Sequence, residues 1–134
     1  MSIGTLGMHG GIINKADTPF ADITQLTTPD SLNLHETIAT ATKQGVTHLA
    51  LEASSHGLQQ HRLDGLNIHV AGFTNLSRDH LDHHINMDDY FAAKLRLFEA
   101  LLIEGGGAVI NVDDVYGQQI VARIKDWPIV VKTY

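Results

Sequence analysis

The 134-residue sequence contains no cysteine and few basic residues. The missing cysteine excludes disulfides and thiolate metal sites, and it agrees with a reducing compartment such as the cytoplasm. Nine Lys plus Arg against fifteen Asp plus Glu give a formal charge of -6, which argues against nucleic acid or an anionic membrane as a partner. A small-molecule partner is therefore expected.

Long apolar runs are also missing. No stretch approaches the roughly 20 apolar residues that a membrane-spanning helix needs, and the first residues do not form a signal-peptide pattern. We expect neither membrane insertion nor export. With 43% apolar residues the chain can bury one ordinary core, and its length suits one domain.

Strand and helix patterns alternate along the chain. Apolar residues recur at helical spacing at Leu34, Ile38 and Ala41, and Gly45 is placed to end that helix. The predicted elements are a surface hairpin of short strands at 11–14 and 20–23, helices at about 31–44, 88–103 and 113–124, and strands at 46–53, 68–74, 108–112 and 129–131. The glycines at 105–107 are expected to terminate the second helix. This alternation predicts an α/β fold with a mostly parallel sheet flanked by helices, whose sites lie at the carboxyl ends of the strands.

Polar residues lie at the far end of the predicted strand at 46–53. Glu52 and Ser54 are the first of them, and Gln60 and Arg62 come shortly after. A carboxylate that leaves a buried strand is costly unless it is paired or holds a cation. Arg62 could grip a carboxylate or phosphate through two parallel hydrogen bonds, and Ser54 and Gln60 could donate more. A capped strand with a solvated loop explains the same residues equally well.

A second polar segment, at 74–84, follows the predicted strand at 68–74. Its oxygen donors with one imidazole suit Mg²⁺ or Mn²⁺, whereas several imidazoles would favour zinc. A zinc hydrolase of the metallo-β-lactamase type needs H-x-H-x-D-H, and Arg78 stands where the first histidine belongs. The adjacent His83 and His84 are more typical of a solvated turn than of a metal site.

Two further features admit a functional and a structural interpretation. Lys94 lies on the flank of an apolar helical stripe, where a lysine usually extends its charged end to solvent. The alternative is a partly buried, neutral amine that can react or be modified. Thr27 and Thr28 precede the first helix, where hydroxyls and backbone N–H groups can bind an anion or simply cap the helix.

Three long motifs closely resemble one protein family. They are TTPDSLNLHET at 27–37, EASSHGLQQHRLDG at 52–65, and FTNLSRDHLDHH with MDDYFAAKLRLF at 73–98. All resemble the central domain of UDP-N-acetylmuramoyl-tripeptide synthetases, the MurE members of the Mur ligase family. The resemblance runs from Ile3 to the INVDD segment at 110–114, and it implies a P-loop NTPase-like domain that serves bacterial cell-wall synthesis in the cytoplasm.

The resemblance also implies a reaction and a set of site residues. ATP phosphorylates the terminal carboxylate of UDP-N-acetylmuramoyl-L-alanyl-D-glutamate, and an amino acid's amine attacks the acyl phosphate through a tetrahedral intermediate. The work is charge neutralisation and positioning. By motif position, the nucleotide sugar-peptide is held by Thr27, Thr28, Ser54, Gln60 and Arg62. Mg²⁺ is bound with the help of Glu52 and His80, and Lys94 matches the family's carbamylated lysine, which holds a second magnesium.

The sequence departs from the family pattern in two respects. Many relatives have Asn where this chain has Leu26, so one substrate contact is in doubt. The family's ATP phosphate site needs a glycine-rich loop ending in Gly-Lys-Ser/Thr, yet none of the five lysines follows a glycine. In relatives that loop lies upstream of the segment matching Ile3, and the domain that selects the amino acid lies beyond the segment matching Tyr134. We therefore expect residues 1–134 to be a partial central domain of a ligase, inactive alone.

Two other classes of function remain open at this point. One is a metal-dependent hydrolase that uses Glu52, His80, Asp82 and His83, and the other is a non-catalytic module that binds a UDP-sugar. The TTP and SSHGLxQHR segments favour the muramoyl substrate over those of folate-polyglutamate and cyanophycin synthetases, which have similar central domains. The third amino acid is either diaminopimelate, which we favour, or lysine. Exposed sheet edges predict self-association of the chain.

Overall fold

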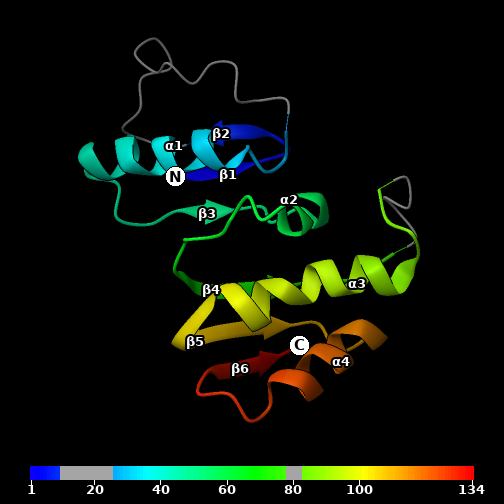
Figure 1. The fold of residues 1–134 in the computed structure, drawn as a ribbon. Coiled ribbons are helices and arrows are strands. Elements are labelled where there is room, and N and C mark those ends of the chain that lie inside the picture. Colours follow the sequence, from blue (N-terminus) through cyan, green and yellow to red (C-terminus); the bar gives the residue numbers. More distant parts are fainter. Residues whose placement is uncertain (10–25, 78–82) are drawn as a thin grey trace. The chain divides into compact units, whose positions relative to one another are not determined.

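The computed structural model describes residues 1–9, 26–77 and 83–134 of the chain. These residues form two compact units, Met1–Asp64 and Gly65–Tyr134. Figure 1 shows the elements in chain order, from blue to red. Each unit is described by itself below.

The first unit contains a small sheet and two helices. Its strands are β1 (Ser2–Gly4), β2 (Gly7–His9) and β3 (Ala50–Leu51), in the order β2-β1-β3. β1 pairs with β2 in antiparallel and with β3 in parallel fashion. The helices are α1 (Ser31–Lys43) and the short α2 (Ser55–Gln59).

Helix α1 confirms the sequence prediction to within one residue. Asp30 caps its start, because the carboxylate accepts a hydrogen bond from the Asn33 backbone N–H. Gly45 follows its end with φ at 85°, a conformation that glycine adopts without a steric penalty. Leu34 and Ala41, two members of the predicted apolar stripe, are buried.

The strands of the first unit were predicted less well. The strand expected at 46–53 is paired only at Ala50 and Leu51, so its predicted extent was wrong. The three-residue strands β1 and β2 and the helix α2 were not predicted, because such short elements carry no recognisable periodicity. The hairpin expected at 11–14 and 20–23 lies outside the described residues.

The second unit has a parallel sheet. Its strands β4 (Ile68–Phe73), β5 (Leu102–Ile110) and β6 (Val130–Thr133) pair in the order β4-β5-β6, with every pairing parallel. The helices are α3 (Met87–Arg96), which continues into the π-helical turn η2 (Leu97–Leu101), and α4 (Val115–Ile124). The predicted fold class, α/β with a mostly parallel sheet and flanking helices, is confirmed.

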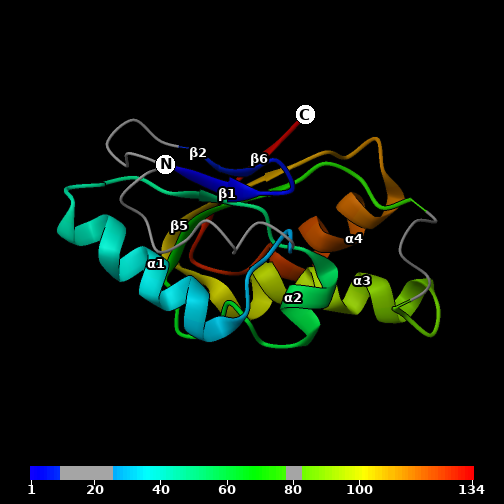
Figure 2. The same ribbon diagram turned by 90° about the horizontal axis from the view of Figure 1, so that it is seen from above.

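The core of the second unit lies between the sheet and its helices. Figure 2 shows α3 and α4 on the same side of the strands. The buried cluster comprises Ala71, Phe73, Leu76, Tyr90, Leu95, Phe98, Ala108, Ile110, Ile120 and Ile124. Alternate residues of each strand face away from this cluster, so Val70, Val109 and Val130 are exposed.

The glycines at 105–107 do not end a helix, and that prediction was wrong. They lie inside β5, where the register against β4 jumps: Ile68 faces Leu102, but Val70 faces Gly107. Gly105 has φ at 76°, and a Cβ on Gly106 would lie 2.8 Å from the carbonyl oxygens of His69 and Ile103. The triplet therefore forms a bulge in which Gly105 and Gly106 hold positions that suit glycine.

No helix in the described part of the chain is long and apolar enough to cross a bilayer.

Candidate functional site

Thr28 is the centre of a hydrogen-bond network in the first unit. Its side chain is fully buried. Its hydroxyl donates to the Glu52 carbonyl oxygen at 2.7 Å and accepts from the Ser54 backbone N–H at 2.9 Å. One hydroxyl therefore fastens the segment before α1 to the segment that follows β3, although 24 residues or more separate them in the sequence.

The start of α2 packs closely against this threonine. Ser54 caps α2, because its Oγ accepts from the Gly57 backbone N–H at 3.1 Å. A Cβ on Gly57 would lie only 2.8 Å from the Cβ of Thr28. The glycine therefore allows the Thr28 side chain to lie directly on the helix backbone.

Arg62 connects the far end of α2 to the same network. Its Nη1 donates to the Thr28 carbonyl oxygen at 2.8 Å, while its Nε and Nη2 donate to Gln60 Oε1 at 3.0 and 2.6 Å. The planar guanidinium is thus fixed by three hydrogen bonds. An oriented guanidinium suits two-point recognition of phosphate or carboxylate.

The Glu52 carboxylate is held by the turn after β1. Its Oε2 accepts from the backbone N–H of Thr5 and from the Thr5 hydroxyl, the latter at 2.8 Å. The Thr5 hydroxyl also lies 3.2 Å from the hydroxyl of Thr27. A Cβ on Gly4 would lie 2.5 Å from Glu52 Oε2, so a side chain there would displace the carboxylate. The Glu52 carboxylate and the hydroxyls of Thr5 and Thr27 are hard oxygen donors, the type that Mg²⁺ prefers.

The structure thus brings together six of the eight predicted site residues. They are Thr27, Thr28, Glu52, Ser54, Gln60 and Arg62. Thr5, which holds both Glu52 and Thr27, was missed, because nothing in its glycine-flanked turn distinguishes it in the sequence. We call this set, including Thr5, the Thr28 network.

The other two predicted residues are Lys94 and His80. Lys94 is half-buried in the last turn of α3, in the second unit, as expected for the flank of an apolar stripe. His80 lies outside the described residues, as do Arg78 and Asp82. Within the described ranges, no three His, Asp or Glu side chains gather closely enough to hold a metal ion.

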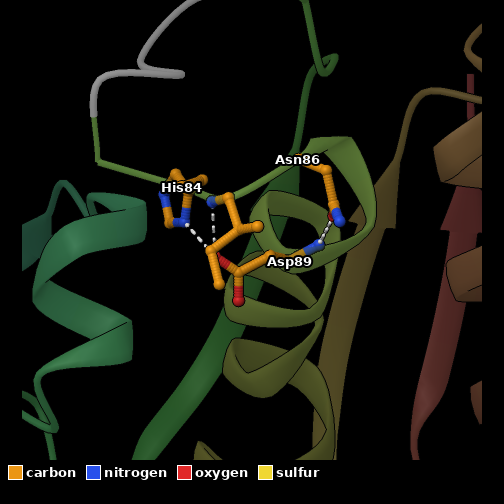
Figure 3. A network of polar contacts seen from close by, with 4 residues as sticks. His84, Asn86 and Asp89 are labelled. Atoms are coloured by element: carbon orange, nitrogen blue, oxygen red, sulfur yellow. Dashed lines mark hydrogen bonds and ion pairs between the residues drawn. The ribbon is translucent and has the colours of Figure 1, made fainter.

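His84 is not in a solvated turn, and that prediction was wrong. It is buried, and its ring stacks on Tyr90 with centroids 4.8 Å apart. Its Nδ1 lies 3.3 Å from Asp89 Oδ2, which also accepts from the Ile85 backbone N–H (Figure 3). His83, in contrast, is exposed as expected.

The start of the polar segment after β4 is also anchored. The Leu76 backbone N–H donates to Asp114 Oδ2 at 2.9 Å, and Oδ1 of the same carboxylate caps α4 by accepting from the Tyr116 N–H at 2.7 Å. Asp114 therefore both anchors the loop after β4 and caps the start of α4.

The pKa of the Asp30 carboxyl departs clearly from its ordinary value. The Asn33 backbone N–H, followed by the Asn33 side-chain amide, lowers the pKa of Asp30 below 3.8. This shift belongs to the cap of α1.

Comparison with known proteins gives consistent results. Residues 2–134 match the family model of the Mur ligase middle domain. The chain is 54% identical over 113 residues to the UDP-N-acetylmuramoyl-L-alanyl-D-glutamate--2,6-diaminopimelate ligase of Mesorhizobium japonicum, covering 84% of this chain and 22% of the relative. It is 48% identical over 112 residues to the enzyme of the same name from Agrobacterium fabrum, covering 84% of this chain and 23% of the relative.

A solved structure of a ligase with this name matches the fold. Its TM-score is 0.72 at 41% identity, and the match covers 81% of this chain and 22% of that one. The chain thus spans less than a quarter of the length of these relatives. Because the model of the Mur ligase middle domain matches residues 2–134, the chain belongs to the Mur ligase family.

Proposed function

We propose that this chain forms part of an ATP-dependent ligase that joins diaminopimelate to UDP-N-acetylmuramoyl-L-alanyl-D-glutamate in peptidoglycan synthesis. The observation that carries the proposal is the Thr28 network, which gathers six motif residues at one end of β3. The names of the relatives support the substrate and the amino acid. The family match favours this ligase over the hydrolase and the simple UDP-sugar-binding module.

The network residues divide into two kinds by their exposure. Gln60 is exposed, and Thr27, Ser54 and Arg62 are half-buried, so these side chains contact the nucleotide sugar-peptide. Thr28 is fully buried and acts by holding Ser54 and Arg62 in place. The Arg62 guanidinium neutralises a phosphate or carboxylate of the anionic substrate.

The reaction transfers a phosphoryl group and then forms an amide. The terminal carboxylate of the substrate attacks the γ-phosphorus of ATP, and ADP leaves. The amine of the amino acid, having lost a proton, attacks the resulting acyl phosphate, and the tetrahedral intermediate expels phosphate. Glu52, His80 and Lys94 would help to hold magnesium, which would neutralise the charge of the phosphates. The oxygen donors around Glu52 suit that ion.

Lys94 takes part as its carbamate. The neutral amine adds to the carbon of CO₂ and loses a proton, which converts a cation into an anionic oxygen ligand. Lys94 is half-buried on α3. ¹³C NMR of the protein under ¹³CO₂ tests this step. We expect Lys94→Arg to remove a carbamate signal. Lys43→Arg, at an exposed position on α1, is the control and should leave the signal unchanged.

Binding by the 134-residue chain tests the site. We expect UDP-N-acetylmuramoyl-L-alanyl-D-glutamate to bind better than UDP in calorimetry. Arg62→Ala should weaken binding about 10- to 100-fold, the value of a hydrogen bond to a charged group. Arg123→Ala, at an exposed position on α4, is the matched control. Equal affinities of the two variants, or no binding by the unchanged chain, would contradict the proposal.

Catalysis needs more than this chain. Since it has no Gly-Lys-Ser/Thr loop, the ATP phosphates lack their usual backbone cradle, and we expect no substrate-dependent ADP release from the 134 residues. The cytoplasm, which supplies ATP and the UDP-linked precursor, is the proposed location. ADP release by the purified chain would contradict the expected inactivity.

A further inference from the structure

The chain leaves α2 through an unusual backbone conformation at His61. Its φ is 59°, the only positive value of a non-glycine residue in the described ranges. Its N–H donates to the Leu58 carbonyl at 3.2 Å, and the Arg62 N–H donates to the Gly57 carbonyl at 2.9 Å. This pair of bonds defines a helix end whose first outside residue is left-handed, a position where glycine is usual.

The left-handed conformation of His61 is held by its neighbours. Its Nδ1 lies 2.9 Å from Asp64 Oδ2, and its carbonyl oxygen accepts from the Asp64 N–H at 3.2 Å. The Asp64 carbonyl oxygen in turn bonds to the ring of His35 on α1 at 3.0 Å. These contacts offset the steric cost of a Cβ in this conformation.

The turn at His61 determines where Arg62 points. Gln60 and Arg62 flank His61, and the reversal there lets the Arg62 guanidinium reach both Gln60 Oε1 and the carbonyl of Thr28. A right-handed helical residue 61 would continue α2 and abolish the bond from the Arg62 N–H to Gly57. The orientation of the guanidinium therefore depends on this one backbone angle.

We propose that His61 is a positioning residue, whose left-handed turn aims the Gln60–Arg62 pair at an anionic group of the nucleotide sugar. The inference rests on the proposed substrate-binding role of Arg62. Residue 61 acts through its backbone conformation, and its imidazole serves to hold that conformation through Asp64.

Two substitutions separate the turn from the imidazole. His61→Gly removes the ring but adopts the left-handed conformation freely, whereas the β-branched side chain of His61→Val strongly disfavours it. His69→Val is the matched control, because His69 lies exposed in strand β4, where valine is favoured. Circular dichroism of each variant confirms that it is folded.

The first readout is proton exchange of the Arg62 Nε–H in ¹⁵N NMR, which reports its bond to Gln60 without any ligand. The second is calorimetric affinity for UDP-N-acetylmuramoyl-L-alanyl-D-glutamate. We expect His61→Val to accelerate the exchange and weaken binding by about tenfold or more, and His61→Gly and His69→Val to stay within about threefold.

Unchanged exchange in folded His61→Val would overturn the inference. Equal losses in His61→Gly and His61→Val would also overturn it, since the imidazole itself would then be the functional group. Failure of the proposed function looks different: Arg62→Ala leaves affinity unchanged, while His61→Val still accelerates exchange.

Discussion

Thr28 and Thr37 are both buried threonines, but their hydroxyls make different hydrogen bonds. Thr28 joins two segments through Glu52 and Ser54, whereas the Thr37 hydroxyl bonds to the Asn33 carbonyl one turn back in α1. In a helix that carbonyl already accepts from a backbone N–H. The Thr28 hydroxyl therefore links two segments of the chain, whereas the Thr37 hydroxyl adds a second bond to a carbonyl within one helix.

We expect Thr28→Val to lower the free energy of unfolding by about 1–3 kcal/mol, because it removes two part-buried hydrogen bonds while conserving shape. Thr37→Val, the matched control, should cost less than about 1 kcal/mol. Urea denaturation measures both. Equal costs would show that the hydroxyl of Thr28 does not hold the network together.

Gly57→Ala tests the close packing of Thr28 on α2. The added Cβ would lie 2.8 Å from the Cβ of Thr28, so we expect a loss of about 1–3 kcal/mol from overpacking, with weaker substrate binding. At Gly72, in β4, a Cβ would meet nothing within 4 Å. Thermal unfolding and calorimetry of both alanine variants measure these effects, and an undisturbed Gly57→Ala would contradict the observed contact.

Sequence motifs identified six residues of the Thr28 network but not their contacts with one another. The substrate contact that the motif predicts for Thr28 stays a prediction, and the structure adds that this buried residue bonds to Ser54 and Arg62. Thr5 lies 47 residues from Glu52, and a partner so far away leaves no local pattern. The burial of His84 likewise depends on its stacking against Tyr90, which the pair His83-His84 does not reveal.

At the scale of elements, the cap of α1 gives a pH dependence. Hydrogen bonds from Asn33 lower the pKa of Asp30 in the folded chain, so its stabilising contribution is present above pH 3.8 and is lost as pH falls through the lowered value. We expect Asp30→Asn to remove this part of the acid sensitivity, since asparagine caps without a charge. Asp30→Ala should cost about 0.5–2 kcal/mol at neutral pH.

NMR titration of Asp30 measures the direction of its pKa shift. Thermal unfolding between neutral pH and pH below 3.8 measures the acid sensitivity of the unchanged chain and of Asp30→Asn. Asp113→Asn, which changes an exposed carboxylate that no described bond places in a helix cap, is the control. An acid profile of Asp30→Asn identical to that of the unchanged chain would refute the link.

Elements with several turns or a full apolar strand were predictable. Helix α1 and strand β4 follow the expected ranges within a residue, because helical spacing and β-branched runs are local properties. The end of the second helix was not predictable, because glycines such as those at 105–107 favour helix termination and sheet bulges alike. Pairing with β4 decided between the two, and pairing is a tertiary property.

At the scale of the whole molecule, composition predicted one core, whereas the chain forms two compact units. The principal buried cluster, with Phe98 and Ile120 at its centre, lies entirely in the second. Among the described residues, the buried polar side chains Thr28, Thr37 and Ser55 lie in the first unit. Fold class was predictable from the alternation of strand and helix patterns.

The sheet of the second unit should promote self-association. β4 and β6 are its edge strands, and Val130 on β6 is 59% exposed. We expect concentration-dependent association in sedimentation, reduced by Val130→Lys, because a charged edge strand resists pairing. Val115→Lys, at a 58% exposed position on α4, should not reduce it. A single monomeric species at all concentrations would refute the expectation.

The bulge in β5 also constrains how the chain can misfold. A strand with regular alternation can slide by two residues against its neighbour and keep the same side chains inside, at little cost. Here Gly105 and Gly106 accept a backbone path that their neighbours cannot, so sliding would place Glu104 or Ala108 where a Cβ is excluded. Gly105 and Gly106 therefore favour one alignment of β5 against β4, and a strand shifted by two residues is disfavoured while the sheet assembles.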